Sequence, residues 1–129
     1  MKLLSFVLFL VILVGCSDEV SFTKAEDAQD AGREFIRASL DGNFPKAEFY
    51  LHKDTVSLLV YNRWKAGFQK MGAEEKMNYR QSNILPIEIK NINDSVVSYT
   101  YSNSYKKEPT TLKVVRINGE WLVDLTELH

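Results

Sequence analysis

The feature that most constrains this fold is a change of hydrophobic period near residue 84. Before that point, apolar and small residues recur about every 3.6 positions, which places them on one face of a helix. After it, apolar residues alternate with polar ones, as they do in strands with one buried face. Helices and strands are therefore segregated along the chain. This order predicts an α+β domain in which N-terminal helices pack on a four-stranded antiparallel sheet.

Local signals set the ends of the first two helices. Thr23 and Glu26 have the spacing of a capping box, which predicts that the first helix begins there. Gly42 follows its last turn, where glycine adopts the left-handed conformation without strain. Pro45 suits the first turn of a second helix over residues 45–51, because its missing N–H has no helical partner at that position.

A third helix is predicted after residue 53. Asp54 is its candidate N-cap and Gly72 its predicted end. Residues 73–80 could form another turn or two of helix, or a loop, and the sequence leaves both open. The helical spacing predicts an inward face made of Val56, Leu59, Val60, Trp64 and Phe68.

The strands are predicted to form a meander. Pro86 places the first strand toward an edge of the sheet, where a missing backbone N–H is tolerated. Asn118 and Gly119 join residues 110–117 to residues 120–126 as a tight hairpin. This dipeptide is favoured because both central residues of a type I′ turn need positive φ.

The N-terminal end carries a separate signal. After a charged start, the apolar run over residues 3–14 is well short of the roughly 20 residues that span a bilayer as a helix. This is the pattern of a secretory signal peptide. Residues 13–16 read Leu-Val-Gly-Cys and resemble the lipobox of bacterial lipoproteins at all four positions. The resemblance implies cleavage between Gly15 and Cys16, with a diacylglyceryl group on the Cys16 thiol and an acyl chain such as palmitate on the new amine.

This resemblance divides the chain into a lipoprotein signal peptide (1–15), a lipidated tether (16–22) and a domain (23–129). The lipid bilayer is then the first expected partner, through acylated Cys16. Ser17 stands where many inner-membrane lipoproteins have Asp, so the resemblance favours the outer membrane in a host with two membranes. The acidic residues after Ser17 resemble a surface-export signal, but a solvated tether also accounts for them and is the preferred interpretation.

The net charge and the types of residue present exclude several classes of partner and cofactor. Sixteen Lys and Arg against 17 Asp and Glu give a formal net charge of −1, without a basic stripe, so nucleic acid is not an expected partner. The two histidines and the single cysteine have no recognisable metal-ligand spacing. Neither a glycine-rich phosphate loop nor a nucleophile motif occurs, so no cofactor is expected.

Two connecting segments between the predicted elements support a more specific fold prediction. Residues 40–47 read Leu-Asp-Gly-Asn-Phe-Pro-Lys-Ala, and residues 116–123 read Arg-Ile-Asn-Gly-Glu-Trp-Leu-Val. With the element order, they resemble the nuclear transport factor 2-like superfamily, the cystatin-like α+β cone, over residues 25–125. The chain is more narrowly similar to small bacterial lipoproteins of unknown function that carry this cone. The resemblance implies a pocket between the helices and the concave sheet face, but both segments are structural and imply no activity.

Aromatic side chains are the candidate ligand contacts of that pocket. They lie at helical spacing in the third predicted helix or at alternating positions in the strands. Such side chains line small-molecule sites, and they also fill ordinary cores. The candidates are Tyr61, Trp64, Phe68, Tyr99, Tyr101 and Trp121.

These observations favour a non-enzymatic, membrane-anchored domain that binds a small apolar ligand or a protein partner of the envelope. The alternative is a small lyase, isomerase or hydrolase in which Asp54 orients His52 as a general base. A surface loop with a helix cap also explains these two residues and is the favoured interpretation. Arg116 is expected at the pocket mouth or at a sheet end, and Asp124 on the solvent side of the last strand.

Overall fold

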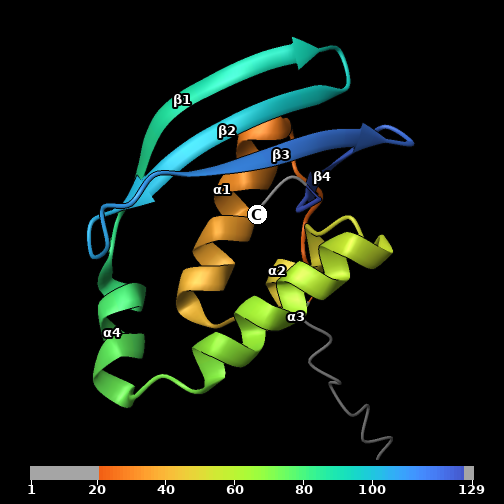
Figure 1. Ribbon diagram of the computed structural model, residues 1–129. Coiled ribbons are helices and arrows are strands. Elements are labelled where there is room, and N and C mark those ends of the chain that lie inside the picture. Colours follow the sequence, from red (N-terminus) through yellow and green to blue (C-terminus); the bar gives the residue numbers. More distant parts are fainter. Residues whose placement is uncertain (1–20, 127–129) are drawn as a thin grey trace, which may run out of the picture.

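The computed structural model describes residues 21–126. The predicted signal peptide, the cleavage site between Gly15 and Cys16 and the acylated Cys16 lie outside the described residues. Within them the chain forms four helices followed by four strands (Figure 1), which confirms the predicted α+β class. In chain order these are α1 (Ala28–Asp41), α2 (Phe44–Phe49), α3 (Thr55–Gln69), α4 (Ala73–Gln81), β1 (Ile84–Asn93), β2 (Val96–Asn103), β3 (Thr110–Ile117) and β4 (Glu120–Asp124).

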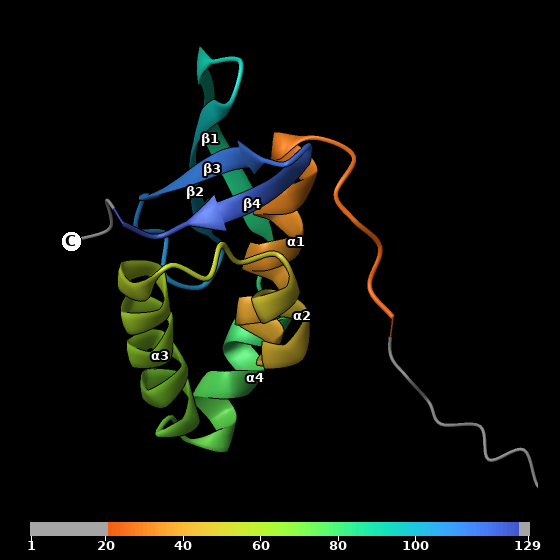
Figure 2. The same ribbon diagram turned by 90° about the vertical axis from the view of Figure 1, so that its right-hand side faces the viewer.

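The four strands form one antiparallel sheet in the order β1-β2-β3-β4. The helices lie on one side of this sheet, as the view in Figure 2 shows. Pro86 lies in edge strand β1, as predicted. Asn118 and Gly119 turn from β3 into β4 with φ values of 51° and 77°, which confirms the predicted hairpin.

The core lies between α1 and the inner face of the sheet. Gly32 allows α1 to approach the sheet closely, because a Cβ there would lie 3.4 Å from the Tyr99 ring. Residues of α1, α2 and β2–β4 therefore form one buried cluster. Its largest fully buried apolar side chains are Phe35, Ile36, Tyr99, Leu112, Val114, Val123 and Leu125.

The first helix begins four residues later than the capping-box spacing predicts. Its N-cap is Asp27, whose side chain accepts from the Asp30 backbone N–H at 2.7 Å. The Asp30 carboxylate in turn accepts from the backbone N–H of Glu26 at 3.1 Å. The two aspartates thus supply the reciprocal bonds expected from Thr23 and Glu26. Thr23 instead accepts from the Tyr50 hydroxyl through its backbone carbonyl, at 2.6 Å.

The turn between α1 and α2 is as predicted. Gly42 has a φ of 69°, and its N–H donates to the carbonyls that end α1. Asn43 then caps α2, with Pro45 in the first turn. Just before α1, the ring of Phe22 packs on that of Phe49, with centroids 5.6 Å apart. The end of the predicted tether is therefore attached to α2.

The predicted inward face of α3 is wrong at two positions. Val56 and Leu59 are exposed, at 47% and 61% of their surface, whereas Ser57 and Tyr61 are buried. The helix also ends at Gln69 rather than at Gly72. The next segment, which the sequence leaves open, is the helix α4.

Ser57 explains the rotation of α3. Its hydroxyl donates to an Asp124 carboxylate oxygen at 3.3 Å and accepts from the Leu125 backbone N–H at 3.0 Å. Because these bonds hold Ser57 against the end of β4, the positions before and after it on the helix cannot also face inward. Apolar periodicity alone does not detect such a polar anchor.

Candidate functional site

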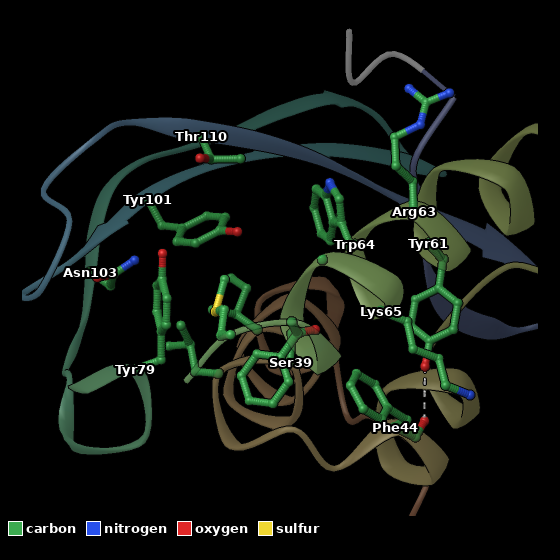
Figure 3. A pocket seen from close by; sticks show the side chains of 15 residues that line it. Ser39, Phe44, Tyr61, Arg63, Trp64, Lys65, Tyr79, Tyr101, Asn103 and Thr110 are labelled. Atoms are coloured by element: carbon green, nitrogen blue, oxygen red, sulfur yellow. Dashed lines mark hydrogen bonds between the residues drawn. The ribbon is translucent and has the colours of Figure 1, made fainter. Parts of the chain in front are cut away.

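A cavity of about 470 Å³ lies under α3, between that helix, α1, α4 and the adjoining ends of β2 and β3 (Figure 3). This size is in the range of small-molecule sites. Its lining is mainly aromatic and apolar, with a few polar side chains. The lining residues are Ile36, Ser39, Leu40, Phe44, Tyr61, Arg63, Trp64, Lys65, Gly67, Phe68, Met71, Tyr79, Tyr101, Asn103 and Thr110.

The cavity brings together four of the six aromatic candidates, three from α3 and one from β2. These are Tyr61, Trp64, Phe68 and Tyr101. Tyr99 does not line it, because its ring is buried in the core against Gly32. Trp121 lies outside it, in β4, with the Arg116 guanidinium 5.9 Å from its ring. Arg116 is therefore at a sheet end and away from the cavity lining.

Ring contacts hold the aromatic wall together. Phe44, from the start of α2, meets Phe68 edge-on with centroids 5.7 Å apart. Trp64 packs on Phe35 of the core at 6.3 Å. The Lys65 ammonium lies 5.2 Å from the centre of the Phe44 ring. The wall on the α3 side is thus built from side chains whose positions are fixed by their neighbours.

Three tyrosine hydroxyls lie at the cavity, and they differ in their partners. Tyr61 donates to the Phe44 backbone carbonyl at 3.3 Å (Figure 3). The hydroxyls of Tyr79 and Tyr101 point into the cavity and have no hydrogen-bond partner within residues 21–126 (Figure 3). Burial raises the pKa of both phenols above the ordinary value, so they remain protonated at neutral pH.

Several lining residues were missed by sequence reasoning. Tyr79 lies in the segment that the sequence leaves open between helix and loop, and Asn103 ends β2, where the sequence predicts only a polar connection. The one sequence signal for Tyr79 is an aromatic residue in an otherwise polar stretch. Nothing in the sequence marks Asn103 as a pocket residue.

The His52–Asp54 pair lies outside the cavity lining. The His52 Nε2 and an Asp54 oxygen are 3.9 Å apart, beyond hydrogen-bonding distance. Asp54 caps α3, as predicted, by accepting from the Ser57 N–H. The neighbouring Ser57 hydroxyl dipole and the bond from the Ser57 backbone N–H lower the pKa of Asp54. Asp124, predicted on the solvent side, is half-buried because it accepts the bond from Ser57.

A second surface feature lies on β1. Four of its apolar side chains are between 39% and 56% exposed, namely Leu85, Ile87, Ile89 and Ile92. Pro86 and two register shifts, after Pro86 and after Asn91, interrupt the regular backbone edge. Both devices oppose the addition of another strand. The strip therefore offers side chains, rather than backbone groups, for contact.

Other classes of site have no support in the described part of the chain. Residues 21–126 contain no group of three or more side chains placed to hold a metal ion. None of the helices described has the length and apolar character of a membrane span. Comparisons with protein-family models, curated proteins and solved structures found no match. The cavity and the exposed strip on β1 are the features from which a function can be argued.

Proposed function

We propose that this chain is a lipid-anchored protein of the bacterial cell envelope whose cone-like domain, of the nuclear transport factor 2-like type, binds a small apolar ligand. The observation that supports it is the cavity of about 470 Å³ under α3. Its walls are aromatic, and two tyrosine hydroxyls point into it (Figure 3). An apolar body with a few polar groups that fix orientation is the usual design of a small-molecule site.

The anchor and the cavity fit together in this proposal. Phe22 packs on α2, so at most residues 16–21 separate the proposed lipid attachment at Cys16 from the domain. Fully extended, they reach at most roughly 20 Å. The domain is therefore held close to the bilayer surface. Apolar compounds concentrate in bilayers, so this position favours their capture.

The ligand can be sought in the protein taken from its own envelope. The full chain is purified from membranes, and small molecules released on denaturation are identified by mass spectrometry. We expect one compound to accompany the wild type and to be lost from Trp64→Ala, which removes a wall of the cavity. Trp121→Ala is the matched control, because Trp121 is also half-buried but does not line the cavity.

Two results would argue against the binding proposal. One is the absence of any such compound from the wild type. The other is its equal loss from both tryptophan variants, which would indicate general unfolding. Circular dichroism on each variant checks that the domain remains folded.

The anchor has its own test. Cells are labelled with palmitate, and the wild type is compared with Cys16→Ser. We expect label only in the wild type, since the thiol accepts the lipid. Label that persists in the variant would refute lipidation at Cys16.

A protein partner is the second candidate, and the apolar strip on β1 favours it. Envelope cross-linking of Ile87→Lys should lose a partner that the wild type retains, because a charge on the strip opposes an apolar contact. Leu59→Lys is the control, since Leu59 is equally exposed but lies on α3. An unchanged cross-linking pattern would exclude this strip. The enzyme alternative receives no support from the cavity, because His52 and Asp54 do not line it.

A further inference from the structure

We infer that the ligand is a small apolar organic acid, with its carboxylate held by hydrogen-bond donors from α4 and the end of β2 and its apolar body against the α3 wall. This inference rests on the proposed function and specifies the ligand class of the same cavity. Its basis is the direction of the polar atoms around the cavity. They are donors at the sheet end, and none of the lining residues is acidic.

Asn103 is the most informative of these groups. Its side-chain oxygen accepts from the backbone N–H groups of Tyr105 and Lys106, at 3.0 and 2.8 Å. These bonds fix the orientation of the amide, so the nitrogen is the atom that points into the cavity (Figure 3). An amide nitrogen donates and cannot accept. We therefore expect the ligand atom next to Asn103 to be a hydrogen-bond acceptor.

Two tyrosine hydroxyls add further donors: that of Tyr79 lies next to Asn103, and that of Tyr101 faces the α3 wall (Figure 3). The Tyr79 hydroxyl, from α4, points toward Asn103 and Tyr101, and the Tyr101 hydroxyl points toward Trp64 (Figure 3). Neither has a hydrogen-bond partner in the described part of the chain. Since burial keeps both phenols protonated, each has a proton to offer. Donors converging from two elements suit a carboxylate, which accepts through both oxygens.

The charges around the cavity favour an acid over an amine. The ionisable side chains among the lining residues, apart from the tyrosines, are Arg63 and Lys65, and both are basic. An ammonium group placed here would leave water without a carboxylate to pair with it, which is costly. A carboxylate at the sheet end would meet the hydrogen-bond donors of Tyr79 and Asn103 and no acidic side chain of the lining. The opposite wall, with Trp64 and Phe68, accommodates an apolar ring.

Three probes with the same ring and different polar ends test this. They are 2-naphthoate, 2-naphthylmethylamine and 2-methylnaphthalene, titrated by calorimetry into the full chain in lipid nanodiscs, with empty nanodiscs as the blank. We expect 2-naphthoate to bind about ten times or more tighter than the neutral probe, as charge-assisted hydrogen bonds commonly give. The amine should bind more weakly than both.

An isosteric variant reverses the chemistry at Asn103. Asn103→Asp keeps the oxygen that accepts from Tyr105 and Lys106 and replaces the donor nitrogen by a second acceptor. It should weaken 2-naphthoate roughly 10- to 100-fold and leave 2-methylnaphthalene nearly unchanged. Asn93→Asp is the matched control, because Asn93 accepts from the Ser95 N–H at 2.8 Å in a similar turn far from the cavity lining.

Tyr79→Phe, which removes the donor beside Asn103, gives a second variant that retains the ring. It should weaken only 2-naphthoate, so the inference remains testable if Asn103→Asp does not fold. Equal or tighter binding of the neutral probe or the amine would overturn the inference while leaving the cavity as a binding site. A failure of all three probes to bind would contradict the proposed function itself. Equal weakening by Asn93→Asp and Asn103→Asp would overturn the role of Asn103.

Discussion

Replacement of Ser57 by alanine should destabilise the domain far more than the loss of one oxygen atom suggests. Ser57 is fully buried, and its hydroxyl joins α3 to the end of β4. In Ser57→Ala the Leu125 N–H loses its acceptor, and an Asp124 oxygen loses its donor. Leu125 is itself fully buried, so water cannot easily replace the missing acceptor.

The magnitude follows from these partners. A buried N–H left without an acceptor costs about 1–3 kcal/mol. The Asp124 carboxylate is half-buried, so water can replace the Ser57 hydroxyl as its donor. The loss of this second bond therefore adds less to the destabilisation. Alanine has a higher helix propensity than serine, which offsets the destabilisation by a few tenths of a kcal/mol. The net expectation is a loss of about 2 kcal/mol, or a Tm lower by about 10 °C for a domain of this size.

Urea unfolding followed by circular dichroism measures this change, with the midpoint and slope compared between variants. Ser39→Ala is the matched control. The Ser39 hydroxyl donates to the Phe35 carbonyl within α1 at 2.8 Å, so its removal leaves no buried N–H without an acceptor. We expect Ser39→Ala to lie within about 0.5 kcal/mol of the wild type. An effect of Ser57→Ala as small as this would refute the anchoring role of Ser57.

Three further predictions concern helix ends and can be measured by the same unfolding assay. Gly42→Ala should destabilise the domain more than Gly119→Ala. Both glycines have positive φ, but a Cβ at Gly42 would lie 2.6 Å from the Phe68 ring, whereas Gly119 faces open space. Equal losses of stability would contradict a clash with Phe68. Because Asp27 caps α1, Asp27→Ala should lower the free energy of unfolding by about 1 kcal/mol, and Thr23→Ala by less than about 0.5 kcal/mol. A larger loss from Thr23→Ala would instead support Thr23 as the cap. Asp54→Asn should reduce the loss of stability on acidification. The pKa of Asp54 is lowered in the folded domain, so its contribution is complete above the ordinary carboxyl pKa of about 3.9 and is lost as pH falls through the lower folded value; parallel pH profiles would contradict this.

Most of the fold could be predicted because its signals are local. Gly42 ends α1 in the left-handed conformation, and Asn118 and Gly119 form the hairpin turn. Pro86 marks the edge strand. Each of these residues restricts its own backbone, whatever the rest of the chain does. The predicted capping box was wrong because Asp27 offers an equivalent cap one turn later, and spacing alone does not rank the two.

The cavity depends on contacts that a local pattern does not contain. Ser57 bonds to Asp124 and Leu125, which follow it by 67 and 68 positions in the sequence. These bonds set which face of α3 is turned inward. Position along a strand matters as well. Tyr101 lies opposite Thr110 at the cavity end of the sheet, whereas Trp121 lies opposite Arg116 near the hairpin. Alternation predicts which face a side chain takes, but only the register places it along that face.

The energetics of the cavity argue that its space is occupied by solvent or ligand. At about 24 cal/mol per Å³, a sealed and empty void of 470 Å³ would cost about 11 kcal/mol, which is comparable to the whole stability of a domain. The space must therefore exchange with water when no ligand is bound. A ligand that displaces this water binds only the folded form, so at 100 times its Kd it should stabilise the domain by about 2.7 kcal/mol. If 2-naphthoate binds without raising Tm, it binds outside this cavity or binds the unfolded chain equally well.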